Sequence, residues 1–497
     1  MSRLIVPIFL LLLAACSQTP PPAGELRVAL AQAPLSLDPR FATDAASQRV
    51  QELLHRGLVR LDDHFEPQPD LAESWRHPDP LQWHFRLRRG VRFSDGTPLT
   101  AADAAATLNA LLDPNLASPH RAGFVAVAEV TAPTPYDLIV RLSAPDASLL
   151  SRLRIGILPA RRAAQPHDAH QTLGCGPYRM AAWDNGGLLL ARADGGKGPA
   201  AIRFVQVKDP VTRALKLVRG EIDFTQNDLP VQLLPYLRRH GNLTLHTRSS
   251  TTFAYLGINL QDEHLRDLRL RRALALALDR AKLKQALVQD LPQLAETILT
   301  PDHWAAAPLP ATRYDPATAE ALLDAAGLPR GRDGVRLHLN YRTSTDPAKL
   351  QLATAIADQW RRVGIEVRIE SLEWGGFYAR IKRGDFQLFS LAWVGIDDPD
   401  IYRLVLHSSM VPPNGANRGR NLDPAIDALL DAAQQSETRA ERRRLYGEIE
   451  RIMQAGQIYI PLWYEPVIAV CGQRVRNFLP AANGSLRSLV EVQLLSR

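Results

Sequence analysis

Short apolar strands alternate with amphipathic helices through much of the second half of this 497-residue sequence. The pattern predicts a strand over 337–341, a helix over 349–363 and a strand over 365–369. A helix over 377–383 then leads into another buried strand, 386–393. Strands that are joined through helices pair in parallel and pack against those helices, so the sequence predicts an α/β fold.

The strand that ends at Trp393 is followed at once by carboxylates grouped around Pro399. These are Asp397, Asp398 and Asp400. In a chain with a formal charge of +7, this local negative charge could receive a cation such as a ligand ammonium. Asp and Pro are also ordinary turn residues, so a solvated turn is the alternative.

The N-terminal residues have the pattern of a secretory signal that ends at a lipid-attachment cysteine. A short positive segment precedes the apolar run from Leu4 to Leu13, which is too short to span a membrane as a stable helix. The tetrapeptide Leu-Ala-Ala-Cys that ends at Cys16 resembles the lipobox of bacterial lipoproteins. We expect a signal peptide over 1–15 and a lipid-anchored tether over 16–24, with an ordinary signal peptide as the alternative. Ser17 after the cysteine favours the outer membrane in a bacterium with two membranes.

The length, charge and cysteines of the chain restrict its number of domains, its partners and its disulfides. A chain of 497 residues predicts two or three domains. The basic residues are dispersed and no aromatic residues alternate with them, so we do not expect nucleic acid as a partner. Cys175 and Cys471 would face an oxidising compartment, which leaves a disulfide between them open. We expect the mature chain to be monomeric and soluble apart from its anchor.

The common catalytic motifs are absent from the sequence. It contains no His-Glu-x-x-His, no Gly-x-Ser-x-Gly and no dinucleotide-binding fingerprint. The segment Gly195-Gly-Lys-Gly198 lacks the first glycine and the final hydroxyl residue of a phosphate-binding loop, so it is read as a surface loop. We therefore expect neither an enzyme nor a cofactor.

Several segments together resemble a known family. They are Leu71-Ala-Glu-Ser-Trp75, Gly90-Val-Arg-Phe-Ser-Asp-Gly-Thr-Pro98, Gly174-Cys-Gly-Pro-Tyr178, Arg219-Gly-Glu-Ile-Asp223, Tyr255-Leu-Gly-Ile-Asn259 and Asn414-Gly-Ala-Asn417. Their order resembles that in the family 5 extracellular solute-binding proteins, the dipeptide-, oligopeptide- and nickel-binding components of ABC importers. The resemblance extends from about residue 25 to residue 470.

The resemblance implies a two-lobed periplasmic-binding-protein fold of type II, in its large three-domain variant. The ligand would lie in an interlobe cleft that closes by a hinge. By position, domain I would comprise 25–50, 166–252 and 465–497, domain II 51–165, and domain III 253–464. The implied function is to capture peptides in the periplasm and deliver them to an ABC permease and its ATPase.

In peptide-binding relatives, a Trp at the end of the strand matching 386–393 begins the ligand contacts, and an Asp three residues later pairs with the peptide ammonium. Trp393 fits the first role, whereas Ile396 occupies the second position. Asp397 or Asp398 would then supply the charge from a shifted register, and Asp400 would cap the next helix. The full set of expected ligand contacts is Pro34, Leu35, Ser36, Tyr255, Trp393, Val394, Asp397, Asp398 and Tyr402. For each of them, core packing or a surface turn is the alternative.

A carrier of nickel, of a metal chelate or of another non-peptide solute is the second candidate function, since the family includes nickel binders. His167 and His170 have a spacing that would place two ligands together on a helix. They fall in a predicted domain crossover away from the cleft, so a surface pair is the alternative.

Overall fold

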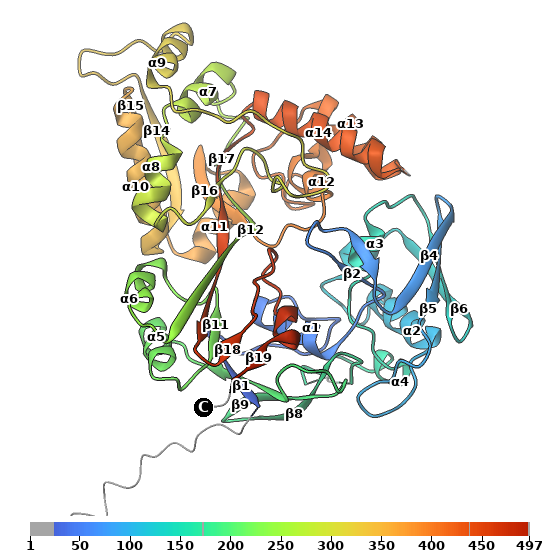
Figure 1. Ribbon diagram of the computed structural model, residues 1–497. Helices are drawn as coiled ribbons and strands as arrows, with labels where there is room; N and C mark the ends of the chain where they lie inside the picture. The colour runs from blue at the N-terminus through green and yellow to red at the C-terminus, as the bar shows by residue number, and fades with distance from the viewer. Residues whose placement is uncertain (1–23, 171–172, 437, 496–497) are drawn as a thin grey trace, which may run out of the picture.

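The computed structural model describes residues 24–170, 173–436 and 438–495 (Figure 1). The predicted signal peptide, Cys16, Ser17 and the tether up to residue 23 lie outside the described residues. No helix among the described residues combines the length and apolar character needed to cross a membrane.

One eleven-stranded sheet runs through the molecule. From edge to edge its strands are β15 (Ile365–Leu372), β14 (Leu337–Ser344), β16 (Leu388–Trp393), β12 (Leu243–Ile258), β17 (Tyr459–Gly472), β11 (Phe224–Gln226), β1 (Glu25–Leu30), β10 (Ala201–Gln206), β9 (Gly187–Arg192) and β8 (Tyr178–Asp184), with β13 (Gln293–Leu294) paired to β17. Helices pack against this sheet, and the prediction of an α/β fold is confirmed (Figure 1).

The alternation predicted at 337–369 is present. Strands β14 and β15 pair in parallel, from Leu337 opposite Ile365 onward, and α10 (Pro347–Arg361) connects them. The Asp346 carboxylate accepts hydrogen bonds from the first-turn amides of α10, which starts the helix at that residue. Helix α11 (Trp374–Arg383) then leads into β16, which pairs in parallel with β14.

Strands β12 and β17 connect the two ends of the large sheet. They pair in antiparallel fashion, and in Figure 1 they run from the part that holds β14 to β16 toward the part that holds β1 and β8. The register shifts between Ser249 and Thr252 and again between Ala254 and Tyr255. Such shifts bend a strand pair and increase its twist, so the two parts of the sheet meet at an angle.

Residues 58–157 hold a second sheet with a core of its own beside the large sheet, and we call them the small-sheet unit (Figure 1). Its strands are β4 (Ala72–Asp79), β5 (Gln82–Leu87), β7 (Asp137–Leu142) and β6 (Val127–Thr134), in that order, and the hairpin of β2 (Val59–Leu61) and β3 (Pro67–Pro69) lies beside them. Helix α2 (Ala101–Leu112) packs on this sheet and begins with a capping box between Thr100 and Asp103. The short helices are α3 (Leu149–Arg152) and α4 (Ala160–Ala163). The domain boundaries given above remain predictions.

The remaining α-helices complete the layers around the large sheet. They are α1 (Ala45–Leu54), α5 (Pro210–Val218), α6 (Leu234–Arg238), α7 (Leu268–Leu276), α8 (Arg280–Val288), α9 (Pro316–Ala325), α12 (Ile401–Leu406), α13 (Pro424–Gln435) and α14 (Arg439–Ala455). Near the C-terminus, β18 (Val475–Arg476) pairs with β19 (Gln493–Leu494), and the 3-10 helix η4 (Arg487–Glu491) precedes β19.

The two described cysteines are free thiols. Cys175 packs in the core of the small-sheet unit, whereas Cys471, on β17, packs in a different core together with residues of β1 and β10. Burial raises the pKa of each thiol to about 12, which keeps both protonated and unreactive at neutral pH. A disulfide between them, which the sequence left open, is absent because their cores are separate.

Candidate functional site

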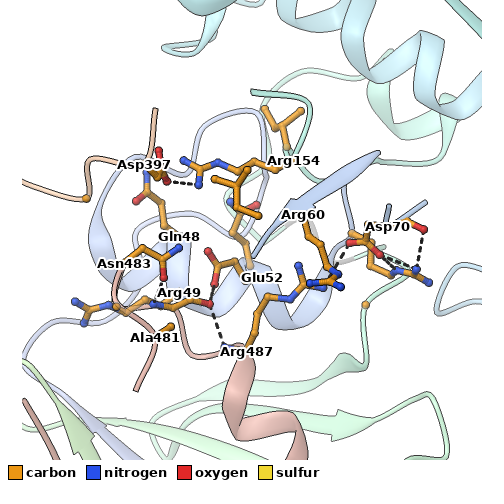
Figure 2. A pocket seen from close by; sticks show the side chains of 18 of the residues that line it. Gln48, Arg49, Glu52, Arg60, Asp70, Arg154, Asp397, Ala481, Asn483 and Arg487 are labelled. Carbon is orange, nitrogen blue, oxygen red and sulfur yellow. Dashed lines mark hydrogen bonds and ion pairs between the residues drawn. The ribbon is translucent and has the colours of Figure 1, made fainter. Parts of the chain in front are cut away.

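A cavity of about 1510 Å³ lies between the small-sheet unit and the large sheet (Figure 2). Its walls come from α1, the β2–β3 hairpin, the segment 152–155, the residues after β16 and the loop 479–491. Segments that are far apart in the sequence therefore meet at one place. We take this cavity as the candidate ligand site.

Helix α1 supplies one wall because its two faces differ. Val50, Leu53 and Leu54 are buried in the core, whereas Gln48 and Glu52, one turn apart, line the cavity. Glu52 accepts a hydrogen bond from the Ser485 hydroxyl of the facing loop. Burial raises the pKa of Glu52, and this hydrogen bond opposes the shift.

The loop after β16 brings Asp397 to the cavity. Gly395 adopts φ +66, a left-handed conformation that glycine accepts without strain and that turns the chain away from the strand. Asp397 is 14% exposed and forms an ion pair through Oδ2 with Arg154 of the small-sheet unit. Burial raises the pKa of Asp397, and the charge of Arg154 opposes that shift.

The position of Arg154 depends on Gly57. A Cβ at residue 57 would lie 2.5 Å from the backbone of Arg154, so only glycine lets the two segments pass this closely. The guanidinium is 44% exposed and reaches across the cavity to the acidic loop (Figure 2). Asp397 thus meets a cation of the same chain across the cavity.

Asp398 takes part in a second contact between the two parts of the molecule. Its Oδ1 accepts a hydrogen bond of 2.8 Å from the Ser148 hydroxyl, and its Oδ2 accepts one from the Ser151 hydroxyl. Arg442 of α14 donates to Ala147 O at 3.0 Å and to Ser148 Oγ at 3.1 Å. Both carboxylate oxygens of Asp398 are therefore engaged away from the cavity.

The β2–β3 turn extends this contact. The ring of Phe65 stacks on His303 with 5.5 Å between centroids, and Glu66 forms an ion pair with Arg439. Burial lowers the pKa of His303 to about 4, so the ring is neutral at neutral pH. We call the whole set of these interactions the rim contact. It comprises Phe65, Glu66, Ala147, Ser148 and Ser151 on one side and His303, Asp398, Arg439 and Arg442 on the other.

Asp400 occupies the position before α12, as predicted, but its carboxylate does not cap the helix. The Asp400 N–H instead donates to Asp398 Oδ1 at 2.8 Å. Burial raises the pKa of Asp400 to about 6, and the negative charge of Asp398 adds to this shift.

Tyr255 and Tyr402, which the sequence analysis expects to contact the ligand, are both fully buried in this structure. Tyr255 lies in the core and its hydroxyl accepts a hydrogen bond of 3.2 Å from Arg418. Tyr402 donates to Glu450 at 2.5 Å and also bonds with Thr297 at 2.9 Å. Helices α12 to α14 cover this face of the sheet, so neither ring is open to solvent.

Trp393 lies one residue before the lining of the cavity. Its indole is half-buried, stacks on Tyr255 at 6.2 Å and lies under the Arg418 guanidinium at 4.2 Å. It is not among the residues that line the cavity, whereas the next residue, Val394, lines it and is 78% exposed.

The segment Pro34-Leu35-Ser36 also lies away from the lining of the cavity. Leu35 is 74% exposed, and Pro34 and Ser36 are buried. The Leu35 and Ser36 amides both donate to the hydroxyl of Ser47, at 2.8 and 3.0 Å. The segment therefore anchors α1 and does not form the cavity wall expected from the sequence.

The sequence-based prediction missed most of the charged residues of the cavity. These are Arg49, Glu52, Arg56, Arg60, Asp62, Asp63, Asp70, Arg88, Arg152, Arg154, Asp194, Arg248, Arg487 and Glu491. The polar face of α1 was a usable signal, because Gln48 and Glu52 fall opposite Val50 and Leu54. The other charged residues of the cavity belong to no local sequence pattern, since they come together only in the tertiary structure.

The two histidines considered as metal ligands each have another partner. His167 lies 3.2 Å from Ser36 Oγ and packs on Phe41, and His170 packs on Trp183. Within the described residues, no three His, Cys, Asp or Glu side chains are grouped as a metal ion requires.

Residues 66–411 match the family model described as bacterial extracellular solute-binding proteins, family 5 Middle. A probable di/tripeptide-binding protein of Pseudomonas aeruginosa is 26% identical over 450 residues, which are 82% of this chain and 84% of that protein. The nickel-binding periplasmic protein of Escherichia coli is 27% identical over 462 residues, 86% of this chain and 87% of that protein. The crystal structure of NikA from Brucella suis in complex with Fe(III)-EDTA matches with a TM-score of 0.84 at 22% identity, over 95% of this chain and 100% of that chain.

Proposed function

Because the chain belongs to the family 5 bacterial extracellular solute-binding proteins, the non-enzymatic binding components of ABC importers, we propose that it captures peptides in the periplasm. It has the type II periplasmic-binding-protein fold of that family. In the proposed role, the monomer closes over a peptide in the cavity and delivers it to a membrane permease and its ATPase. Val394 and Asp397 contact the peptide, and Trp393 supports them.

The observation that carries this proposal is the size and charge of the cavity. Pockets for small ligands usually measure about 300–1,000 Å³, and this one measures about 1510 Å³. Its lining contains charged residues of both signs and the segment 479–485, which lies outside any helix or strand. A peptide also carries both charges, and its backbone can be bound without reference to its side chains.

Nickel or a metal chelate is the competing ligand class, because a nickel-binding periplasmic protein is among the relatives. Peptides are favoured over a bare metal ion, since the cavity lining holds many charged side chains but no group of metal-binding residues among those described. Native mass spectrometry of protein purified without refolding tests the proposal directly. We expect co-purified peptide masses, whereas a retained metal chelate or another solute would contradict it.

Asp397→Asn tests whether the acidic loop binds a peptide ammonium. Arg154 engages Oδ2, so Oδ1 remains to accept from a ligand. A hydrogen bond between charged groups contributes about 1.5–3 kcal/mol. We therefore expect the substitution to weaken binding of trialanine about tenfold or more in calorimetry, with little effect on N-acetyl-trialanine.

Asp400→Asn is the matched control, because Asp400 lies next to the same loop but outside the lining of the cavity. The affinity of the Asp400→Asn variant for trialanine should match that of the unsubstituted protein. If trialanine and its N-acetyl form bind the unsubstituted protein equally, the chain has no ammonium site at Asp397.

Cys16→Ala tests the proposed anchor to the membrane. The sequence before Cys16 resembles a lipobox, and removal of the thiol prevents lipid attachment. We expect the substituted protein in the soluble periplasmic fraction and the unsubstituted protein in a membrane fraction, the outer membrane if Ser17 directs sorting. Cys175→Ala is the control and should stay with the membrane. Unchanged membrane retention of the Cys16 variant would refute lipid anchoring.

A further inference from the structure

One wall of the cavity carries more positive charge than the protein itself neutralises. Arg60 of β2 and Arg487 of η4 both line the cavity, and Figure 2 shows their side chains directed toward the same region, next to Asp70. Arg56 pairs with the same carboxylate. Three guanidinium groups thus lie near one carboxylate.

Asp70 cannot neutralise all three. Its side chain is 5% exposed and its Oδ1 pairs with Arg56 at 2.6 Å. Its Oδ2 reaches Arg487 only at 3.4 Å. Arg60 is exposed toward the cavity and forms neither a hydrogen bond nor an ion pair through its side chain with any residue that the structure describes.

The other carboxylates of the cavity are mostly engaged elsewhere. Asp62 accepts from the amides of its own turn and from Gln68, Asp63 faces Arg248 at 3.5 Å, Asp194 pairs with Arg192, and Asp397 pairs with Arg154. Glu52 accepts from Ser485, and its charge interacts with that of Arg487 without a direct ion pair between them. Glu491 is exposed and has no ion-pair partner among the described residues. Arg60 and Arg487 therefore retain donors that can bind an anion from the ligand.

A cleft that closes over its ligand removes water from these groups, and a charge that loses water without gaining a partner is costly. Guanidinium groups match the planar geometry of a carboxylate and the oxygens of a phosphate through paired N–H donors. We propose that Arg60 and Arg487 form an anion subsite that binds a carboxylate or phosphate group of the transported solute.

This inference uses the same cleft as the proposed function and narrows its ligands to solutes with an anionic group. In a peptide, that group would be the C-terminal carboxylate or an acidic side chain. An anionic solute that is not a peptide would use the same two guanidinium groups, so the subsite can be tested separately from the peptide proposal.

The test compares the purified full chain, freed of bound ligand by unfolding and refolding, with its Arg60→Gln/Arg487→Gln variant. Calorimetry uses trialanine, trialanine amide and an amidated tripeptide that contains one glutamate. We expect the unsubstituted protein to bind trialanine at least tenfold more tightly than trialanine amide. The variant should lose this preference to within about twofold. Recovery of affinity with the glutamate peptide would identify the side chain as a second source of the anion.

Arg332→Gln/Arg368→Gln is the matched control, because it removes the same charge from exposed residues outside the lining of the cavity. It should keep the preference of the unsubstituted protein, and all three proteins should unfold at similar temperatures. Equal binding of trialanine and its amide by the unsubstituted protein would overturn the anion subsite. A preference that survives in the Arg60/Arg487 variant would overturn it as well.

If no peptide binds, the peptide proposal fails, and the binding of simple anions then tests the anion subsite by itself. Succinate and inorganic phosphate, at matched ionic strength, should then raise the melting temperature of the unsubstituted protein and of the control but not that of the Arg60/Arg487 variant. An equal shift in all three proteins, or no shift in any, would overturn the subsite.

Discussion

Asp398→Ala is expected to weaken ligand binding about a hundredfold, although Asp398 is not among the residues that line the cavity. Its two oxygens accept hydrogen bonds from Ser148 and Ser151 of the facing unit, and these bonds hold the two parts of the molecule together. Each hydrogen bond to a charged group contributes about 1.5–3 kcal/mol, so their loss costs the closed form about 3 kcal/mol. A solute held between two lobes loses affinity to the extent that closure is disfavoured.

Calorimetry with the solute identified by native mass spectrometry measures the affinity, and small-angle X-ray scattering measures the radius of gyration. We expect the Asp398 variant to be more expanded than the unsubstituted protein. Asp400→Asn is the control, because its carboxylate approaches Arg152 only at 4.0 Å, and it should change both quantities little. Equal affinity and equal scattering for Asp398→Ala would show that the rim contact does not control closure.

The serines provide an independent check on this argument. Ser148→Ala/Ser151→Ala removes the donors and keeps the carboxylate, so it should also weaken binding. Adding Asp398→Ala to this double variant should lower the ligand affinity little further, because the three residues act as one unit. Additive losses would instead indicate that Asp398 acts through another interaction.

Glu450→Ala is expected to lower the free energy of unfolding by about 3 kcal/mol. Glu450 is fully buried on α14, where it accepts hydrogen bonds from the Tyr402 hydroxyl at 2.5 Å and from the Ala307 amide at 2.6 Å. Alanine leaves a cavity and removes the acceptor of a buried amide, and each of these effects lowers the free energy of unfolding. Urea unfolding measures the change. Glu448→Ala on the same helix is the control, since the Glu448 side chain is 45% exposed and pairs only with the Arg444 side chain of its own helix, and it should cost less than about 0.5 kcal/mol.

Glu450 also predicts how stability depends on pH. Burial raises its pKa to about 7 from an ordinary value of 4.5, so the folded protein holds this proton more tightly than the unfolded chain. Its contribution is fully present below about pH 4.5 and is lost as the pH rises to about 7. Glu450→Gln cannot titrate, so the difference in unfolding free energy between the two proteins should change across this range and level off above it. Parallel pH profiles would contradict the assignment.

Local features of the fold were predictable from the sequence. The β14-α10-β15 unit follows from apolar periodicity, and its helix begins where Asp346 and Pro347 place a cap and a first-turn proline. The capping box at Thr100 and the strand that ends at Trp393 were predictable for the same reason. Such signals depend on residues a few positions apart, so the sequence alone carries them. The order of the family segments added the two-lobed architecture.

The candidate site was predictable only in part. The sequence placed Asp397 and Val394 after a strand that reaches the cleft, and both line the cavity. It could not show that Tyr255 and Tyr402 are covered, because the covering helices α13 and α14 lie elsewhere in the chain. The sequence around a tyrosine on a strand or helix is the same whether that side of the element faces solvent or packs against another layer.

The partners of the charged residues were decided by the tertiary structure alone. Asp397 meets Arg154 from 243 positions away, and Asp398 meets Ser148 from 250 positions away. Arg487 reaches Asp70 across most of the chain. Periodicity and capping are encoded within a few residues and therefore appear in the sequence. Which charges are neutralised, and which remain for a ligand, depends on chain topology that brings distant segments to one cleft.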